Sequence, residues 1–119
     1  MNSNYYNRGR LISSYVWNGA VVGCGKTTST GPLKLSRFKP SNILQWELNE
    51  LNTSGGQWND LANKPMEAQV SLSKRHGSVA QVGRFDGSAG RIPIVDVNKG
   101  ASAAAVNDLW CYPDSGNGH

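Results

Sequence analysis

The sequence predicts an all-β or β-dominated α+β domain, an antiparallel meander or sandwich of about six to eight short strands with one short C-terminal helix. Three observations favour this class. The 119 residues include 14 Gly and 5 Pro, scattered along the chain as turn residues are. Ser, Thr, Asn and Val are common, whereas long helix-forming runs of Ala, Glu, Leu and Lys are missing. Turn signals interrupt the apolar stretches roughly every ten residues, a spacing typical of all-β domains.

The chain length fits a single domain that buries one modest core. We expect an extended N-terminal arm over residues 1–10, one β-rich domain over residues 11–110 and a turn-like C-terminal tail over residues 111–119. The arm is polar and contains two arginines, and a neighbouring subunit is one surface against which it could lie.

The first predicted strands flank Asn18 and Gly19. Asn-Gly is the preferred pair for a type I′ turn, because both central residues of that turn need a positive φ. The pattern therefore predicts a hairpin in which Leu11–Trp17 pairs with Ala20–Cys24.

Two short motifs in this region suggest other functions, and neither fits. Gly-Lys-Thr at residues 25–27 lacks a glycine at the spacing of a phosphate-binding loop, and a helix-breaking Gly-Pro follows it. Val-Val-Gly-Cys at residues 21–24 resembles a lipoprotein processing site, but the preceding segment is too polar for a signal peptide. Lys26 is the only residue there that keeps a possible functional role.

Two predicted strands follow a loop over residues 25–32. Residues 33–39 alternate Leu with Lys or Ser, which predicts a strand with one basic face. Residues 41–51 alternate as a strand does, although three leucines also fall at helical spacing behind a possible serine cap. We favour the strand, because a Gly-rich turn follows at residues 52–56 and Trp58 opens the next apolar stretch.

The second half of the chain alternates more clearly. It predicts three strands, at residues 66–73, 79–85 and 91–97. Turns separate them at residues 74–77 and 86–90. Pro93 cannot donate to a ladder, so the last strand must be an edge strand or a bulged one. Ala101–Leu109 is the best candidate for the helix.

No residue pattern predicts catalysis. Ser71 and Lys74 match the Ser-x-x-Lys spacing of some acyl-transfer enzymes, but residues three apart on a strand point to opposite faces. His76 has no acidic residue at a spacing that links the two. The histidines and cysteines also lack the spacing of metal ligands. We therefore expect a protein that is not an enzyme and has no metal or cofactor.

Cys24 and Cys111 allow two states. As a disulfide they would close most of the chain and add about 4 kcal/mol on the chain-entropy model. As two buried free thiols they would suit a cytosolic or virion protein. The lack of a convincing export signal favours the free thiols, and no stretch has the ~18 apolar residues of a transmembrane helix.

Four tryptophans are many for a chain of this size, and about half of them should belong to the core. Trp58 lies just after a Gly-rich loop, where exposure is easiest, so it is the best candidate for stacking on a sugar or a base. The predicted hairpin would place Trp46 on the neighbouring strand, which makes it the second candidate.

The net charge of +4 permits an anionic partner without requiring one. In a meander, the basic face of residues 33–39 and the outward polar residues of 66–73 could share one sheet face, which would suit a phosphate backbone. The predicted nucleic-acid-binding residues are Lys34, Arg37, Lys39, Ser71, Ser73, Lys74 and Arg75. A solvated sheet face is the simpler alternative.

These observations predict a self-associating, non-enzymatic structural subunit, such as a phage or virus coat protein or another virion protein, whose mildly basic face contacts nucleic acid. Its expected partners are copies of itself and nucleic acid, with no membrane, and we expect it in a virion or the cytoplasm rather than in a secreted state. The alternatives are a carbohydrate-binding or adhesin-like module that uses Trp58 or Trp46, and a small nucleic-acid-binding protein.

Overall fold

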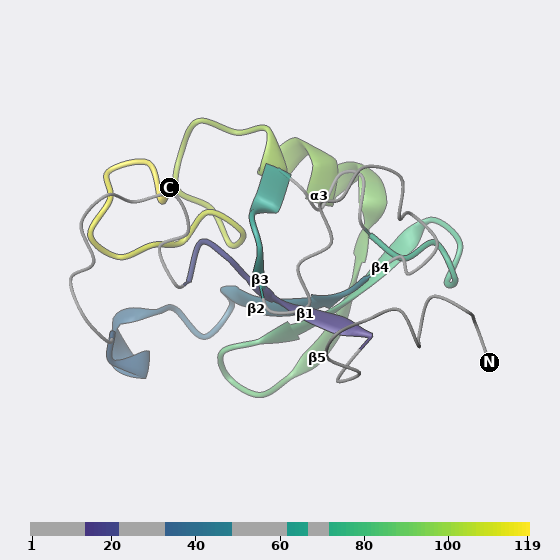
Figure 1. Ribbon diagram of the computed structural model, residues 1–119, viewed down its shortest axis with the longest axis horizontal. Coiled ribbons are helices and arrows are strands. Elements are labelled where there is room, and N and C mark those ends of the chain that lie inside the picture. The colour runs from purple at the N-terminus through teal and green to yellow at the C-terminus, as the bar shows by residue number, and fades with distance from the viewer. Residues whose placement is uncertain (1–13, 22–32, 49–61, 67–71) are drawn as a thin grey trace.

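The computed structural model describes residues 14–21, 33–48, 62–66 and 72–119, and Figure 1 shows their arrangement. These residues include a sheet, a short 3-10 helix and the α-helix α3, and Pro65 and Met66 are also helical. The elements are β1 (Tyr15–Asn18), η1 (Leu35–Arg37), β2 (Ile43–Glu47), β3 (Ala62–Asn63), β4 (Val79–Arg84), β5 (Ala89–Pro93) and α3 (Ile94–Ala101). The fold is therefore dominated by a sheet and has a C-terminal helix, as the sequence predicted.

The five strands form one mixed sheet in the order β3-β1-β2-β4-β5. β1 pairs with β2, β2 with β4 and β4 with β5, all antiparallel, whereas β1 and β3 are parallel. The prediction of a purely antiparallel meander is therefore wrong at β3, and the described residues contain fewer strands than expected. Alternation along a strand shows which residues face the core, but it does not show which strands pair.

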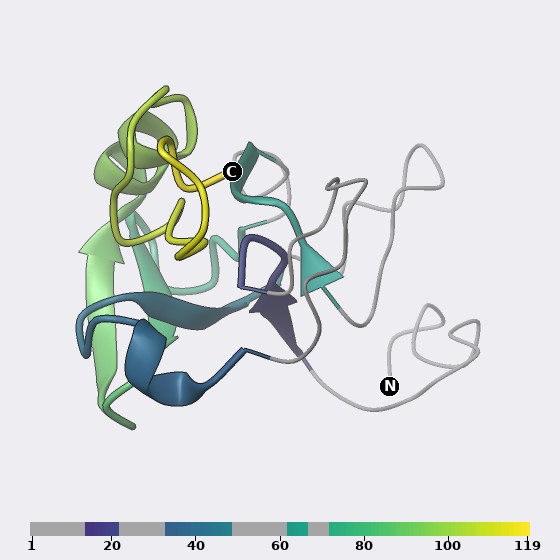
Figure 2. The ribbon, with the colours of Figure 1, turned by 90° about the vertical axis from the view of Figure 1, so that its left-hand side faces the viewer.

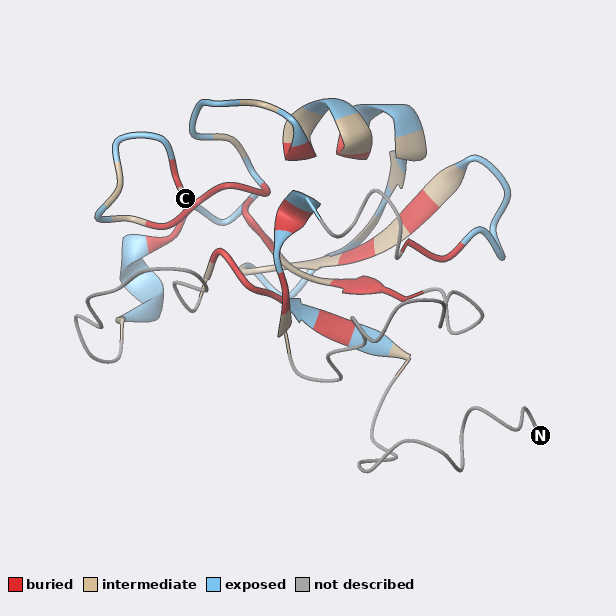
Figure 3. Cartoon of the chain, turned by 45° about the horizontal axis from the view of Figure 1, so that its top comes forward, coloured by how far each residue is buried: buried red, intermediate tan, exposed pale blue. Residues whose placement is uncertain are grey.

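One face of the sheet forms the core. Val16, Trp46 and Val82 lie in register across β1, β2 and β4, and all three are buried. Val97 and Ala101 of α3 pack against this face (Figure 3). Because successive strand residues point to opposite faces, the residues between these buried ones lie on the far side of the sheet, away from α3.

α3 begins seven residues before the helix that the sequence predicted. Pro93 ends β5 and precedes the helix, so the predicted strand 91–97 stops there. Ile94, Val97 and Ala101 follow the i, i+3, i+7 spacing of a helical face, and the last two are buried. Asp96 lies in the first turn, where a carboxylate is favourable. The prediction of Ala101–Leu109 as the helix is thus wrong.

The Asn18–Gly19 corner is a buried junction and not a two-residue hairpin. The Asn18 side chain is fully buried; its Nδ2 donates to the carbonyl oxygens of Ile43 and Leu109, both at 2.8 Å. Neither Asn18 nor Gly19 has a positive φ, which a type I′ turn requires. A Cβ on Gly19 would lie 2.9 Å from the Asn63 carbonyl oxygen, so the glycine is needed for close approach to β3. The predicted hairpin is therefore wrong.

The segment after α3 folds back over the core, and the predicted tail 111–119 packs with it. Trp110 is buried and donates from Nε1 to the Ala101 carbonyl oxygen at 2.8 Å. His119 stacks on the Trp110 ring, with centroids 3.6 Å apart. The N–H of Tyr112 donates to the carbonyl oxygen of Gly118, which closes residues 112–118 into a loop (Figure 2).

Residues 33–39 do not form the predicted strand. The N–H of Arg37 donates to the Lys34 carbonyl oxygen and that of Phe38 to Leu35, which closes the turn of η1. Phe38 is buried and stacks on Phe85, with centroids 4.3 Å apart, whereas Leu35 is 74% exposed. Phe38 thus anchors this segment. Leu35, one of the two leucines whose alternation predicted a strand, does not face the core.

The predictions for the second half of the chain hold in part. β4 lies within the predicted strand 79–85, and both flanking turns form, with a positive φ at Gly77 and Gly87. β2 confirms a strand rather than a helix within 41–51. Of the predicted strand 66–73, Leu72 is buried and bridges Leu48, but Met66 is exposed and not inward. Residues 67–71 lie outside the described residues.

β5 is an edge of the sheet, as Pro93 predicted. The N–H of Ile94 donates to the Ser78 carbonyl oxygen and continues the β4–β5 ladder. Because alternate residues of an antiparallel strand bond to the same neighbour, Ala89 and Arg91 direct their backbone groups away from β4. The free side of β5 thus presents few donors before Pro93, which has no N–H.

Candidate functional site

The structure separates the basic residues that the sequence placed on one sheet face. Lys34, Arg37 and Lys39 lie in and beside η1 at one end of the molecule (Figure 1). Residues 74–75 belong to the turn before β4, at the opposite end. The prediction of one shared basic face is therefore wrong.

Ser73 does not lie on an exposed face either. It is buried, and its Oγ accepts the N–H of Arg75 at 3.3 Å, so the hydroxyl shapes the turn and is shielded from a phosphate. Ser71 lies outside the described residues.

Arg37 is held by an acidic partner. Its guanidinium donates to both carboxylate oxygens of Asp114, at 3.1 Å for Nη1–Oδ2. Hydrogen bonding to Asp114 raises the pKa of Arg37 above its ordinary value. A bidentate pair of this kind fixes the guanidinium, so Arg37 links η1 to the C-terminal segment.

Arg75 contacts the buried carboxylate of Glu47. Arg75 Nη1 lies 3.0 Å from Oε1, and His76 Nε2 lies 3.1 Å from Oε2 without hydrogen-bond geometry. The N–H of Ser73 also donates to the Glu47 carbonyl oxygen, so this turn is tied to the end of β2. Removing Arg75 would leave the buried carboxylate of Glu47 without this compensation. This cluster therefore serves as an anchor for the turn.

The tryptophan that the structure exposes is one that the sequence did not single out. Trp46 is only 1% exposed and offers no surface for stacking, so the prediction that it stacks on a ligand is wrong. Trp58 lies outside the described residues. Trp17 is 50% exposed, and Tyr15, two residues earlier, is 38% exposed. Val16 between them is buried. The alternation in Tyr-Val-Trp-Asn was the signal that could have identified Trp17.

Trp17 belongs to a row of residues that crosses all five strands. The row follows from the register and consists of Ala62, Trp17, Gln45, Gly83 and Ala89. Three of these five side chains are Ala or Gly, so little projects beside the indole. A Cβ on Gly83 would lie 3.0 Å from Cγ of Gln45, which shows that the glutamine side chain lies across β4 at this point.

A second row on the same face adds polar groups. Gln81 pairs with Arg91, and both belong to the face of Gly83, two residues away along β4. Arg91 is exposed, and the described residues offer it neither an ion pair nor a hydrogen bond for its guanidinium. We call this surface the open sheet face and define it by its larger side chains, Tyr15, Trp17, Gln45, Gln81 and Arg91.

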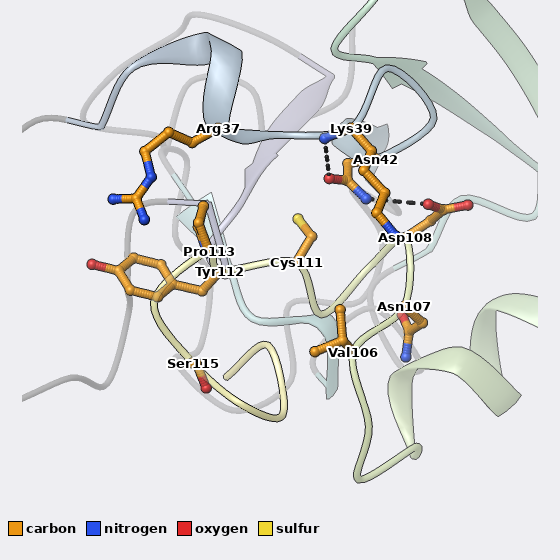
Figure 4. A pocket seen from close by; sticks show the side chains of 10 residues that line it. All are labelled: Arg37, Lys39, Asn42, Val106, Asn107, Asp108, Cys111, Tyr112, Pro113 and Ser115. Atoms are coloured by element: carbon orange, nitrogen blue, oxygen red, sulfur yellow. Dashed lines mark hydrogen bonds between the residues drawn. The ribbon is translucent and has the colours of Figure 1, made fainter.

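A cleft of about 210 Å³ lies between the segment after η1 and the C-terminal segment (Figure 4). Its polar groups bind each other: Asn42 accepts the N–H of Lys39 at 2.8 Å and donates to Asp108 at 3.1 Å. Its charges also balance: Arg37 pairs with Asp114 beside the cleft, and Lys39 and Asp108 add one charge of each sign to the lining. The cleft therefore shows no strong preference for an anion or a cation.

Cys111 points into this cleft (Figure 4) but is a poor nucleophile. It is a free, buried thiol, and burial, with a smaller effect from Asp108, raises its pKa to about 12. The thiolate is the reactive form, and at neutral pH it would be rare. Of the two states that the sequence allowed, Cys111 adopts the free thiol, and Cys24 lies outside the described residues.

A second groove of about 230 Å³ separates α3 from residues 107–109. Ile43, Ile92, Val97 and Leu109 provide apolar walls, and Asp96 and Asp108 line the same groove.

The remaining observations concern metals, membranes and relatives. Among the described residues, no three His, Cys, Asp or Glu side chains gather as metal ligands would. Within the same part of the chain, every helix is too short or too polar to cross a bilayer. Comparison with family models, curated proteins and solved structures finds no match.

Proposed function

We propose that this protein is a non-enzymatic structural subunit that self-associates, such as a coat or other virion protein, and that its open sheet face contacts nucleic acid. The observation that carries the proposal is the exposure of Trp17 on a sheet face that also presents two glutamine amides and an arginine. Aromatic side chains on a sheet stack on bases, and an arginine pairs with phosphate.

The charges of the chain support an anionic partner for this face. The net charge is +4, and Arg91 lies on the face itself. Lys74 and Arg75 belong to the turn that contacts Glu47 at the end of β2, so they border the face. The basic residues near η1 lie at the other end of the molecule (Figure 1) and form no part of the proposed contact.

A matched pair of charge substitutions tests the nucleic-acid contact. Arg91→Gln and Lys99→Gln each remove one exposed positive charge, but Lys99 lies on α3, which covers the opposite face of the sheet. Fluorescence anisotropy with labelled oligonucleotides should show weaker binding for Arg91→Gln and nearly unchanged binding for Lys99→Gln. Equal effects would indicate non-specific attraction to net charge and would contradict the assignment of this face.

Light scattering of the full chain tests the self-association. We expect oligomers or particles at micromolar concentration, and absorbance at 260 nm relative to 280 nm reports any packaged nucleic acid. A monomer throughout this range would refute the coat proposal. A glycan array addresses the carbohydrate-binding alternative, because Trp17 could also stack on a sugar; a signal that Trp17→Ala abolishes would favour that alternative.

A further inference from the structure

We infer that the open sheet face binds single-stranded nucleic acid, with one base stacked on Trp17 and a phosphate contacting Arg91. This inference rests on the proposed function and specifies the class of ligand. It follows from four features of the face: the small residues near Trp17, its width, the amide groups across it and its shortage of positive charge.

The small residues near Trp17 favour unpaired bases. Trp17 is flanked by Ala62 on β3 and by Gln45 on β2, and the next residue of the row is Gly83. The Gln45 side chain is directed across Gly83, so the half-exposed indole can present its ring to a base. In a duplex the faces of the bases are covered by their neighbours, so a stacking platform of this kind selects a single strand.

The width of the face sets the number of nucleotides. Trp17 lies on β1 and Arg91 on β5, with β2 and β4 between them, so three strand spacings separate the two strands. At about 4.8 Å per spacing, the two strands lie roughly 14 Å apart. Arg91 also lies two residues along β5 from the row of Trp17, about 7 Å, so the two positions are roughly 16 Å apart. At the ~3.4 Å rise of stacked bases, the stacked base and the contacted phosphate therefore belong to nucleotides up to about five positions apart.

The polar groups between these two ends suit the edges of bases. Gln45 lies across Gly83, and Gln81 is the cross-strand partner of Arg91. Each amide offers both a donor and an acceptor, which matches the mixed pattern on a base edge. Neither amide makes a hydrogen bond to the described residues, so both groups are available.

The shortage of positive charge disfavours a duplex. Duplex binders typically contact six to ten phosphates with Lys and Arg side chains. Among the residues that define the open sheet face, Arg91 is the only cation. At its border lie Lys74 and Arg75, and the charge of Arg75 is paired with Glu47. A face with one cation and one exposed indole is better matched to a few stacked nucleotides.

The test compares a labelled 20-nucleotide single strand with the matching duplex by anisotropy, using the full chain. We expect at least tenfold tighter binding to the single strand. Trp17→Ala should lower that affinity about tenfold or more, and Trp17→Phe should retain most of it, because a phenyl ring still stacks. Arg91→Gln should reduce the slope of log K against log salt by about 0.7, the value for one phosphate of a single strand.

The outcomes separate the inference from the proposed function. Equal affinity for the duplex, or unchanged binding by Trp17→Ala, would overturn the single-strand inference and leave nucleic-acid binding intact. No binding of either oligonucleotide would overturn the proposed function and the inference with it. Far-ultraviolet circular dichroism confirms that each variant is folded, which we expect because Trp17 and Arg91 project from the side of the sheet away from α3.

Discussion

Replacing Asn18 by Ala should destabilise the protein more than any exposed substitution. Asn18 is fully buried and makes three side-chain hydrogen bonds. Its Nδ2 donates to the carbonyl oxygens of Ile43 and Leu109, and its Oδ1 accepts the N–H of Ala20. The alanine variant would leave two carbonyl oxygens and one N–H buried without these partners.

The cost follows from the three groups that lose their partner. Each buried polar group left unsatisfied costs about 1–3 kcal/mol. Partial relaxation around the small void reduces the sum, so we expect Asn18→Ala to lower the free energy of unfolding by about 3–5 kcal/mol. A domain of this size has about 5–15 kcal/mol in total. The variant should therefore still fold, with little stability remaining.

Urea unfolding followed by the fluorescence of the buried Trp46 and Trp110 measures this change. Asn18→Asp separates lost volume from lost donors, because it keeps the shape but turns an oxygen toward two carbonyl oxygens. We expect it to be at least as unstable as Asn18→Ala near neutral pH. Asn117→Ala, at an exposed asparagine of the C-terminal segment, is the control and should cost less than about 1 kcal/mol. The reasoning fails if Asn18→Ala costs under about 1 kcal/mol, or if Asn18→Asp matches the wild type.

Three further predictions concern other parts of the fold. Gly118→Ala should cost more than about 2 kcal/mol in urea unfolding, because the φ of Gly118 is +79° and a Cβ there would lie 2.1 Å from a backbone carbonyl oxygen. Gly116→Ala, which meets nothing within 4 Å, should be nearly neutral, and equal losses would contradict the steric argument. Burial raises the pKa of the Cys111 thiol to about 12. In a variant whose only thiol is Cys111, a thiol reagent at about pH 8 should therefore react about a thousandfold more slowly with the folded protein than with the protein unfolded in urea. Equal rates would show that the thiol is accessible in the folded protein. Hydrogen bonds from Ser88 lower the pKa of Asp86 in the folded protein. Asp86 therefore stabilises the fold at pH values above its ordinary pKa, and this contribution is lost as the pH falls through the lower pKa of the folded state. Asp86→Asn should therefore flatten the acid side of the stability curve, and an unchanged curve would contradict this role.

The sequence predicted best where local pattern and tertiary packing agree. In β4 the alternating residues Ala80 and Val82 are also the ones that face α3, and the flanking turns contain Gly77 and Gly87 with a positive φ. Backbone conformation and burial there depend on neighbours along the chain, which a sequence pattern reports directly.

The sequence failed where distant segments determine the local structure. Asn18-Gly19 has the composition of a tight turn, but Asn18 binds residues 25 and 91 positions away, and Gly19 is needed for contact with Asn63. Ile94 and Val97 fit an alternating strand as well as a helix, and only Pro93 and the packing of Val97 on the core separate the two.

The candidate site shows the same division. Trp17 could have been identified from the alternation around Val16, because a strand with a buried valine must direct its neighbours to the other face. The position of Trp17 relative to Gln45 and Arg91 could not have been predicted, because it depends on the order of the strands in the sheet. The sequence analysis grouped the basic residues by assuming the strand order of a meander. In the structure the two groups lie at opposite ends of the molecule.

The free side of β5 limits how copies of this protein could join. An edge strand normally offers a template on which a second chain extends the sheet. In β5 only Ala89 and Arg91 direct an N–H group outward, and Pro93 has no N–H. In a symmetric pairing of two β5 strands centred on Arg91, the two arginines would also face each other and repel. A continuous sheet through β5 is therefore disfavoured. Subunits that assemble must instead meet through side-chain surfaces or other segments.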